Sequence, residues 1–442
     1  MLRSLTLISL TVHLVSLAAT QTAYGAGFSL LRWLSLFALT SFAGLYWLTS
    51  GQRGLRSQSV ELRVAICLGL WGLTVVNAEY PWFSGYRWGA HAMIVVSALV
   101  FLPACIRLAD APRAVLVLKL IVAAVLLASY FRPVRLTAFD NHNWYRGIFG
   151  NANSLGEMAA VGCLLFWHGF LTQRGAWRRY LQATLAGLAA FLMFEAGGRS
   201  AVVAFVGGVI TLYILYGGRV SRHLVYGTIG ILIAIAVLPN LQQRVGTFII
   251  KHSTEYQSAG ALDALIFSHR RVWESSWEGF TQRPVLGWGF GADSSSNLSA
   301  WNGELTALGF AQRDPVNDIL YSLETGGIIG LIAYLTIVAL IFKAWMPGRL
   351  RSRLDVALHQ RGLEPLGSAY DVQKLSCCTT VLLIVLFEFD NTALSAGNFF
   401  SALLWISLGQ SLGLSRRLMR GVTDAPPASV SLRRHSAEVP AE

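Results

Sequence analysis

Charged residues are scarce in this chain. Only 13% of its 442 residues are Asp, Glu, Lys or Arg, whereas 54% are hydrophobic, and the mean hydropathy is +0.52. A soluble chain of this length would carry roughly a quarter charged residues. The deficit excludes a large soluble domain and indicates a polytopic membrane protein.

Cysteine is also scarce. The five cysteines are Cys67, Cys105, Cys163, Cys377 and Cys378, and all fall inside or beside apolar runs. None has the spacing of a zinc site or of a redox motif. We therefore expect small buried hydrophobic residues, and we predict neither a disulfide framework nor a metal site.

Acidic residues are outnumbered by basic ones. The counts of 23 Asp and Glu against 35 Lys and Arg give a formal net charge of +12. In a soluble protein this excess would suggest nucleic acid. In a membrane protein, lysines and arginines on cytoplasmic loops set the orientation and meet anionic lipid, so membrane lipid is the expected partner and nucleic acid is not.

Long apolar runs dominate the rest of the sequence. A membrane-spanning helix needs about 20 apolar residues, and the runs predict an all-α polytopic membrane protein with about twelve transmembrane helices. The first run resembles a signal peptide, but another follows at once, so we expect a retained span. The runs lie near residues 4–22, 28–49, 60–78, 89–107, 113–130, 153–172, 180–196, 199–216, 222–239, 318–345, 375–392 and 396–415.

The spans predict four parts. Residues 1–239 hold transmembrane helices one to nine, and residues 318–421 hold helices ten to twelve. Between them, residues 240–317 are too rich in apolar and aromatic side chains for a disordered loop, and we expect a small helical cap. Residues 422–442 are rich in Pro, Ala and Ser, which predicts a disordered tail.

The distribution of basic residues predicts the orientation. With the N-terminus inside, the short inner loops are nearly all basic, which places both ends of the chain in the cytoplasm. A second set of arginines then falls on the outer side, where arginine is usually scarce. Its members are Arg132, Arg135, Arg146, Arg199, Arg270 or Arg271, Arg283 and Arg313.

The outer arginines suggest an anion site. The guanidinium fork suits bidentate binding of phosphate oxygens, and converging arginines can hold a diphosphate and stabilise negative charge as it leaves. The glycines of "GIFGNANS" and "EAGGRSA" offer backbone amides at helix starts, which also suit an anion. The alternative is that the arginines meet lipid headgroups or pair with outer acids, and it stays open. Those acids include Asp140, Glu195, Glu274 and Glu278.

Four stretches together resemble a known family. They are "YRGIFGNANSLGEMAAVGCLLF", "EAGGRSAVVAFVGGVI", "WESSWEGFTQRPVLGWGFGAD" and "PVNDILYSLETGGIIGLIAYL", in this order. Their order and spacing resemble the O-antigen ligase superfamily, which includes O-antigen ligases and polysaccharide polymerases. The resemblance covers roughly residues 140–400 and implies a GT-C-like membrane fold.

The resemblance implies glycosyl transfer on the periplasmic face of the bacterial inner membrane. The donor would be a glycan on undecaprenyl pyrophosphate, the acceptor a second glycan or lipid A-core, and no cofactor or metal would be needed. By matched position the donor pyrophosphate would meet Arg146, Arg199 and Arg270 or its neighbour Arg271. Asn151 and Asn317 lie in the same motifs and complete the predicted binding set, while catalytic roles fall to Arg199, Arg270 and Asp318.

One position departs from the ligase pattern. The family's ligases carry a histidine before the tenth span as the proposed base, and Val316 stands there in this chain. Either another group takes the proton or no strong base is used. The departure also favours a polymerase over a ligase. A non-catalytic or transport protein is a further alternative. Candidate bases are Asp314, Asp318, Glu304 and His269, and Glu388 and Asp390 either line an acceptor path or pair with an arginine.

Overall fold

The computed structural model describes residues 1–22, 25–50, 58–78, 81–131, 145–173, 175–216, 273–291, 317–345, 367–388 and 398–423. In this part of the chain every regular element is a helix, apart from one isolated bridge between Thr22 and Phe149. The predicted all-α class is confirmed there. The predicted span at 222–239, most of the predicted cap and the tail beyond Thr423 lie outside the described residues.

The described apolar runs are all helical. The long helices are α1 (Leu2–Thr20), α2 (Ser29–Thr49), α3 (Gln58–Val76), α4 (Pro81–Val96), α6 (Ala111–Phe131), α7 (Ala152–Thr172), α8 (Ala176–Glu195), α9 (Arg199–Tyr216), α14 (Asp318–Trp345), α16 (Gly367–Phe387) and α17 (Phe399–Thr423). A π-helix, η3 (Ser97–Phe101), and the short α5 (Leu102–Cys105) continue α4, and a 3-10 turn, η1 (Gly25–Phe28), precedes α2. A further helix covers residues 273–282.

Among the described residues, 8 helices are long and apolar enough to cross a membrane, with α4, η3 and α5 counted together. They are α1, α2, α3, the α4–α5 unit, α6, α7, α9 and α14. The predicted spans at α8 and α17 are helical but more polar, because charged side chains lie towards one end of each. These are Arg178 and Arg179 in α8 and Arg416 and Arg417 in α17. The part of α16 whose side chains the structure describes, residues 371–387, is shorter than the 18 residues that a candidate span requires.

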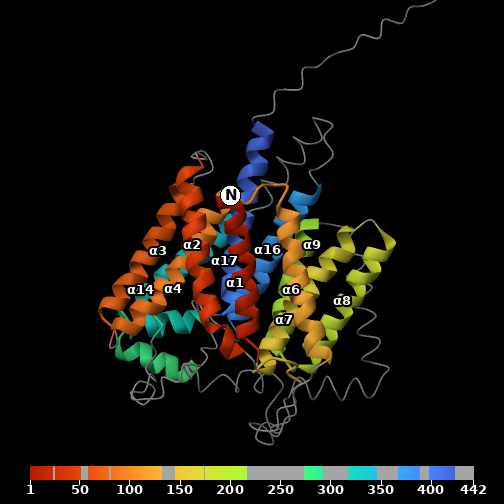
Figure 1. Ribbon diagram of the computed structural model, residues 1–442. Coiled ribbons are helices and arrows are strands. Elements are labelled where there is room, and N and C mark those ends of the chain that lie inside the picture. The colour runs from red at the N-terminus through yellow and green to blue at the C-terminus, as the bar shows by residue number, and fades with distance from the viewer. Residues whose placement is uncertain are drawn as a thin grey trace, which may run out of the picture.

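The helices form a bundle with two flanks and a middle (Figure 1). On one flank α3 packs against α14 and α4, and on the other α7 packs against α8, α9 and α6. Between them lie α1, α16 and α17, where α16 contacts both α9 and α17. The helices differ in how deeply they are buried. In the most apolar stretch of α7, 78% of the residues are buried, whereas in that of α6 only 17% are.

The bundle has two chemically different ends. At the upper end of Figure 1, near Met1, Arg3 pairs with Asp110, and Arg417 donates to the carbonyl of Ala104. At the lower end the N–H of Gly150 donates to Gln21, and the amide of Asn317 donates to the carbonyl of Glu388. The described segments that were predicted to share a side of the membrane therefore meet at one end.

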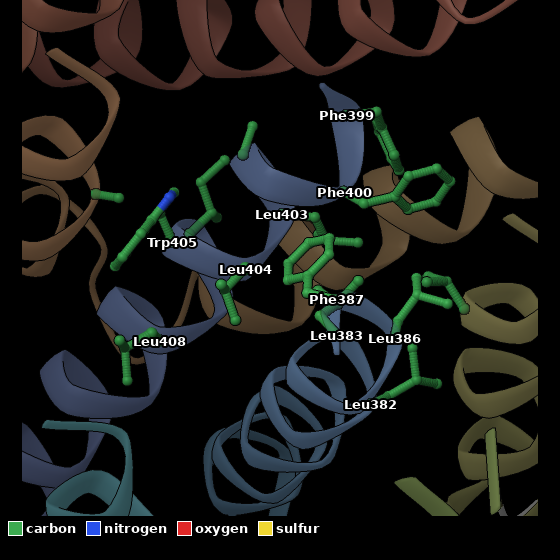
Figure 2. Packing of buried hydrophobic residues seen from close by; sticks show 14 of the residues in the cluster. Leu382, Leu383, Leu386, Phe387, Phe399, Phe400, Leu403, Leu404, Trp405 and Leu408 are labelled. Atoms are coloured by element: carbon green, nitrogen blue, oxygen red, sulfur yellow. The ribbon is translucent and has the colours of Figure 1, made fainter. Parts of the chain in front are cut away.

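The core between α16 and α17 is apolar and close-packed (Figure 2). Phe387 of α16 and Phe399, Phe400 and Trp405 of α17 are each 0% exposed. Leucines of both helices fill the space between these rings. All five cysteines are buried and free, which confirms that they act as small hydrophobic residues.

Helix α14 is broken in the middle. Gly327 has non-helical angles, φ 60° and ψ −154°, inside the helix. The segment 284–289, far away in sequence, supplies partners on both sides of the break: the N–H groups of Trp288 and Gly289 donate to Glu324 and Thr325. In return, the N–H groups of Ile328 and Ile329 donate to Pro284 and Val285. The break is thus closed by backbone hydrogen bonds in both directions.

Replacing Gly327 by alanine should destabilise the protein. A residue with a side chain costs roughly 1–3 kcal/mol in this backbone region, and the added Cβ would lie 2.4 Å from the backbone of Val285. We expect a lower unfolding temperature for Gly327→Ala in detergent, followed by tryptophan fluorescence. The matched control is Gly187→Ala on α8, where a Cβ meets nothing within 4 Å, and its unfolding temperature should hold or rise. Equal unfolding temperatures for the two variants would contradict the role assigned to the break.

Candidate functional site

Two arginine-bearing motifs lie side by side at the lower end of the bundle. The N–H of Tyr145, in the loop before α7, donates to the carbonyl of Glu195 at the end of α8 over 3.2 Å. The N–H of Phe149 closes a turn onto the carbonyl of Arg146. The sequence expected both motifs on one side of the membrane, and the structure places them in direct contact.

Glycines allow this close approach. A Cβ added to Gly156 of α7 would lie 3.3 Å from the Cα of Gly198, in the turn that leads into Arg199. Gly147 and Gly197 have positive φ values of 57° and 64°. A Cβ on Gly147 would also meet the side chain of Ser129 at 2.4 Å. The turn after Arg146 is therefore available only to glycine.

Arg146 and Arg199 are the described arginines of this region. Both are partly buried. Nη1 of Arg146 donates to the carbonyl of Gly150 at 2.8 Å, while its Nε is buried and has no hydrogen-bond partner among the described residues. Desolvation lowers the pKa of Arg146 from its ordinary value, yet an arginine stays charged in proteins. Arg199 is the first residue of α9, so it stands beside the N-terminal N–H groups of that helix.

The two predicted asparagines cap helices. Oδ1 of Asn151 accepts from the N–H of Asn153 at the start of α7. Oδ1 of Asn317 accepts from the N–H of Leu320 in α14, and its Nδ2 donates to the carbonyl of Glu388 over 3.1 Å. Asn151 is exposed beside the Arg146 turn, whereas the Asn317 amide joins α14 to the end of α16. A ligand can reach Asn151 without breaking its cap, because an amide has further hydrogen-bonding capacity.

One phenol, Tyr334 in the second half of α14, lies near two acids. Tyr334 Oη donates to Oε1 of Glu388 at 2.7 Å, and Asp318 lies within electrostatic range of the same tyrosine. Asp318, a predicted catalytic residue, is 0% exposed. Tyr334, Glu388 and Asn317 therefore form a partly buried polar group that joins α14 to α16 at the lower end, and the buried Asp318 lies near Tyr334.

Other outer arginines hold the segment after residue 282 in place. Nη1 of Arg87 donates to the carbonyl of Gly291 at 2.6 Å, and its guanidinium lies over the ring of Phe83. The guanidinium of Arg283 lies 4.1 Å from the ring centroid of Trp288. The sequence grouped Arg283 with Arg146 among the outer arginines, but the printed contacts of Arg283 and of Arg87 are with this segment and with Phe83.

Several predicted residues lie outside the described part of the chain. They are Arg132, Arg135, Asp140, Arg270, Arg271, His269, Glu304, Arg313, Asp314, Val316 and Asp390. Their roles stay predictions. In the described part no three His, Cys, Asp or Glu side chains come together as a metal site would require.

Sequence reasoning missed two side chains near the site. Glu157 of α7, which lies one turn after Asn153, is 2% exposed. Tyr334 holds Glu388 from the far half of α14. Glu157 carried a usable signal, since it is a lone acid inside an apolar run. Tyr334 did not, because a tyrosine in an apolar span is common at membrane interfaces.

The helical bundle and its apolar helices define a multi-pass membrane protein. Residues 183–335 match the family model described as O-antigen ligase, and this match confirms the resemblance to the O-antigen ligase superfamily. The matched region runs from α8 to α14 and includes Arg199 and Asn317, while Arg146, Asn151 and Glu388 lie beyond its limits. No curated protein matches the chain.

Removing the Tyr334 hydroxyl should destabilise the fold. Tyr334→Phe leaves a partly buried Glu388 carboxylate without its donor, and an unsatisfied buried group costs about 1–3 kcal/mol. Thermal unfolding of Tyr334→Phe, Glu388→Gln and the double variant measures the coupling, and the double variant should lose less than the sum of the two. Tyr213→Phe on α9, whose ring is 40% exposed, is the control. Strict additivity of the two losses would show that the hydrogen bond contributes nothing.

Proposed function

We propose that this protein is a glycosyltransferase of the bacterial inner membrane. It transfers a glycan from undecaprenyl pyrophosphate to a lipid A-core or other glycan acceptor on the periplasmic face. The observation that carries the proposal is the contact between the Arg146 loop and the turn before Arg199, in a chain that carries an O-antigen ligase domain. The lower end of the bundle then faces the periplasm, in agreement with the basic residues at the upper end.

The two arginines would bind the donor diphosphate. Each stands beside the start of a helix, α7 or α9, whose first N–H groups favour an anion. The buried Nε of Arg146 supports this role, since an anion would satisfy it. The predicted Arg270 or Arg271 would complete the set from the segment before the 273–282 helix.

The reaction is a displacement at the anomeric carbon. An acceptor hydroxyl forms the new C–O bond, the bond from the sugar to the diphosphate breaks, and undecaprenyl pyrophosphate leaves with the electron pair. Guanidinium groups on the diphosphate stabilise the charge that develops on this leaving group. The hydroxyl proton passes to a base, which contributes about 10²–10⁴-fold where one is used.

Val316 in place of the ligase histidine favours a second candidate function. Valine cannot accept a proton, so a polymerase that joins lipid-linked repeat units is the alternative to a ligase. Asp318 would serve as base only after its buried carboxylate opens to the acceptor, since it is 0% exposed. A reconstituted assay with lipid-linked repeats, lipid A-core and a second lipid-linked unit as rival acceptors separates ligase from polymerase by the product formed.

Loss of either arginine should abolish transfer while the protein stays in the membrane. We expect Arg146→Ala and Arg199→Ala to lower the transfer rate in proteoliposomes on the order of 10²-fold or more, because charge stabilisation at the leaving group is lost. Lysine at either position should restore only part of the rate, since it lacks the bidentate fork. Arg178→Ala, an exposed position at the start of α8, is the control. Wild-type rates in the alanine variants would overturn the assignment.

Asn151 allows capping and substrate binding to be separated. Asn151→Asp keeps a good helix cap, so the unfolding temperature should stay near that of the wild type. The new negative charge beside Arg146 should weaken diphosphate binding, and we expect the KM for the lipid-linked donor to rise about tenfold. Asn151→Ala removes the cap and should lower stability by about 1 kcal/mol. An unchanged donor KM in Asn151→Asp places the diphosphate elsewhere.

A further inference from the structure

A hollow opens at the lower end on the flank away from Arg146 and Arg199. It has a volume of about 510 Å³ and is lined by Asn77, Ala78, Arg283, Pro284, Val285 and Leu286. Its walls come from the turn between α3 and α4 and from the segment that closes the break in α14. The Arg146 and Arg199 motifs belong instead to α7, α8 and α9, on the opposite flank of Figure 1.

The wall formed by residues 283–286 is fixed. Carbonyls of Pro284 and Val285 accept from α14 across the helix break. Further along, a Cβ on Gly289 would lie 2.2 Å from the Cβ of Ala78, so the segment presses on the α3–α4 turn. Phe290 is 2% exposed and packs against Trp71 and His91, with ring centroids 5.5 and 5.3 Å away. The hollow is therefore preformed rather than a product of a loose loop.

Arg283 is held in one orientation. Its guanidinium lies over the Trp288 ring, and the indole N–H of Trp288 is fixed by the carbonyl of Gly279 at 3.0 Å. Stacking uses the face of a guanidinium, whereas carboxylates and phosphates are bound by the N–H groups on its edge. An arginine ordered in this way loses little freedom when an anion arrives.

The remaining lining suits a sugar. The exposed amide of Asn77 can donate to and accept from hydroxyls, and Pro284, Val285 and Leu286 offer apolar surface to C–H groups. The elements on either side carry exposed indoles, Trp82 at 83% and Trp277 at 53%. Exposed aromatic rings stack on sugar faces or lie in the membrane interface.

We propose that this hollow binds the acceptor as a saccharide that carries a carboxylate or phosphate group, with Arg283 on the charged group and Asn77 on hydroxyls. The assignment of this saccharide as the acceptor rests on the proposed glycosyl transfer. A separate acceptor site fits a two-substrate reaction in which the donor diphosphate occupies the Arg146 and Arg199 side.

Binding is tested without turnover. The full chain in phosphatidylcholine nanodiscs is titrated with tri-galacturonate and with a neutral galactose trisaccharide, and binding is followed by thermophoresis. We expect tri-galacturonate to bind more tightly, and Arg283→Gln to weaken it about tenfold or more, since charge-assisted hydrogen bonds are lost. The affinity of Arg283→Lys for tri-galacturonate should lie between those of the wild type and of Arg283→Gln. The control is Arg113→Gln at the upper end, where the Arg113 side chain is 84% exposed.

Three results would overturn this assignment. The first is equal affinity of the acidic and neutral sugars, and the second is unchanged tri-galacturonate binding in a folded Arg283→Gln protein. The third is displacement of tri-galacturonate by phosphatidylglycerol in the disc, which assigns the hollow to a lipid headgroup. Unfolding curves of each variant show that it is folded.

Turnover separates this proposal from the proposed function. In the transfer assay, Arg283→Gln should raise the acceptor KM about tenfold for an acidic acceptor and leave the donor KM unchanged. Arg283-dependent sugar binding without any transfer by the wild type would reject the glycosyltransferase and keep the saccharide site. Transfer by the wild type, together with an unchanged acceptor KM in Arg283→Gln, would support the glycosyltransferase and reject the saccharide site.

Discussion

A broken helix inside a membrane must find partners for its backbone from within the protein. The hydrocarbon core offers no water to an exposed N–H or C=O, and each unsatisfied group there costs several kcal/mol. Helix α14 meets this demand at Gly327 through the segment 284–289, which both donates to it and accepts from it. This exchange links part of the predicted cap to the membrane bundle.

The same exchange explains why the surrounding residues are glycine and aromatic. Gly287 and Gly289 have φ values of 63° and 109°, and a Cβ on Gly287 would meet the backbone of Thr325 at 2.4 Å. Phe290 then anchors the segment against Trp71 and His91, and His91 in turn packs against Trp405. The glycines of the "GWGFG" stretch therefore serve close contact with neighbouring segments.

Local signals in the sequence were sufficient for the parts of the fold that depend on local physics. Hydropathy predicted where the described helices lie, and "GNANS" contained the Asn151 cap of α7. The break in α14 was not predicted: the pair Gly326 and Gly327 permits a kink, but the segment that closes it lies about forty residues earlier in the chain.

The candidate site shows a similar division. The contact between the Arg146 loop and the Arg199 turn follows from glycines that the sequence displays, so its existence was predictable even though its atoms were not. Arg87 and Arg283 were not separable from Arg146 by sequence, because charge and side of the membrane are the same for all of them. Their contacts differ: those of Arg87 include a ring and a carbonyl, those of Arg283 include a ring, and Arg146 donates to a glycine carbonyl and has a buried Nε.

These differences give the lower end an asymmetry that suits two substrates. On one flank, the turns that carry Arg146 and lead into Arg199 lie beside each other at the starts of α7 and α9, whose first N–H groups would favour the concentrated negative charge of the proposed diphosphate. On the other, a single stacked arginine borders a hollow with mixed polar and apolar walls, which favours a larger ligand with one charged group. Asn317 and Tyr334 join α14, which belongs to this second flank, to Glu388 at the end of α16. In the proposed transfer, Glu388 and Asp318 are the carboxylates near Tyr334 that would be candidates to take the proton from an acceptor hydroxyl.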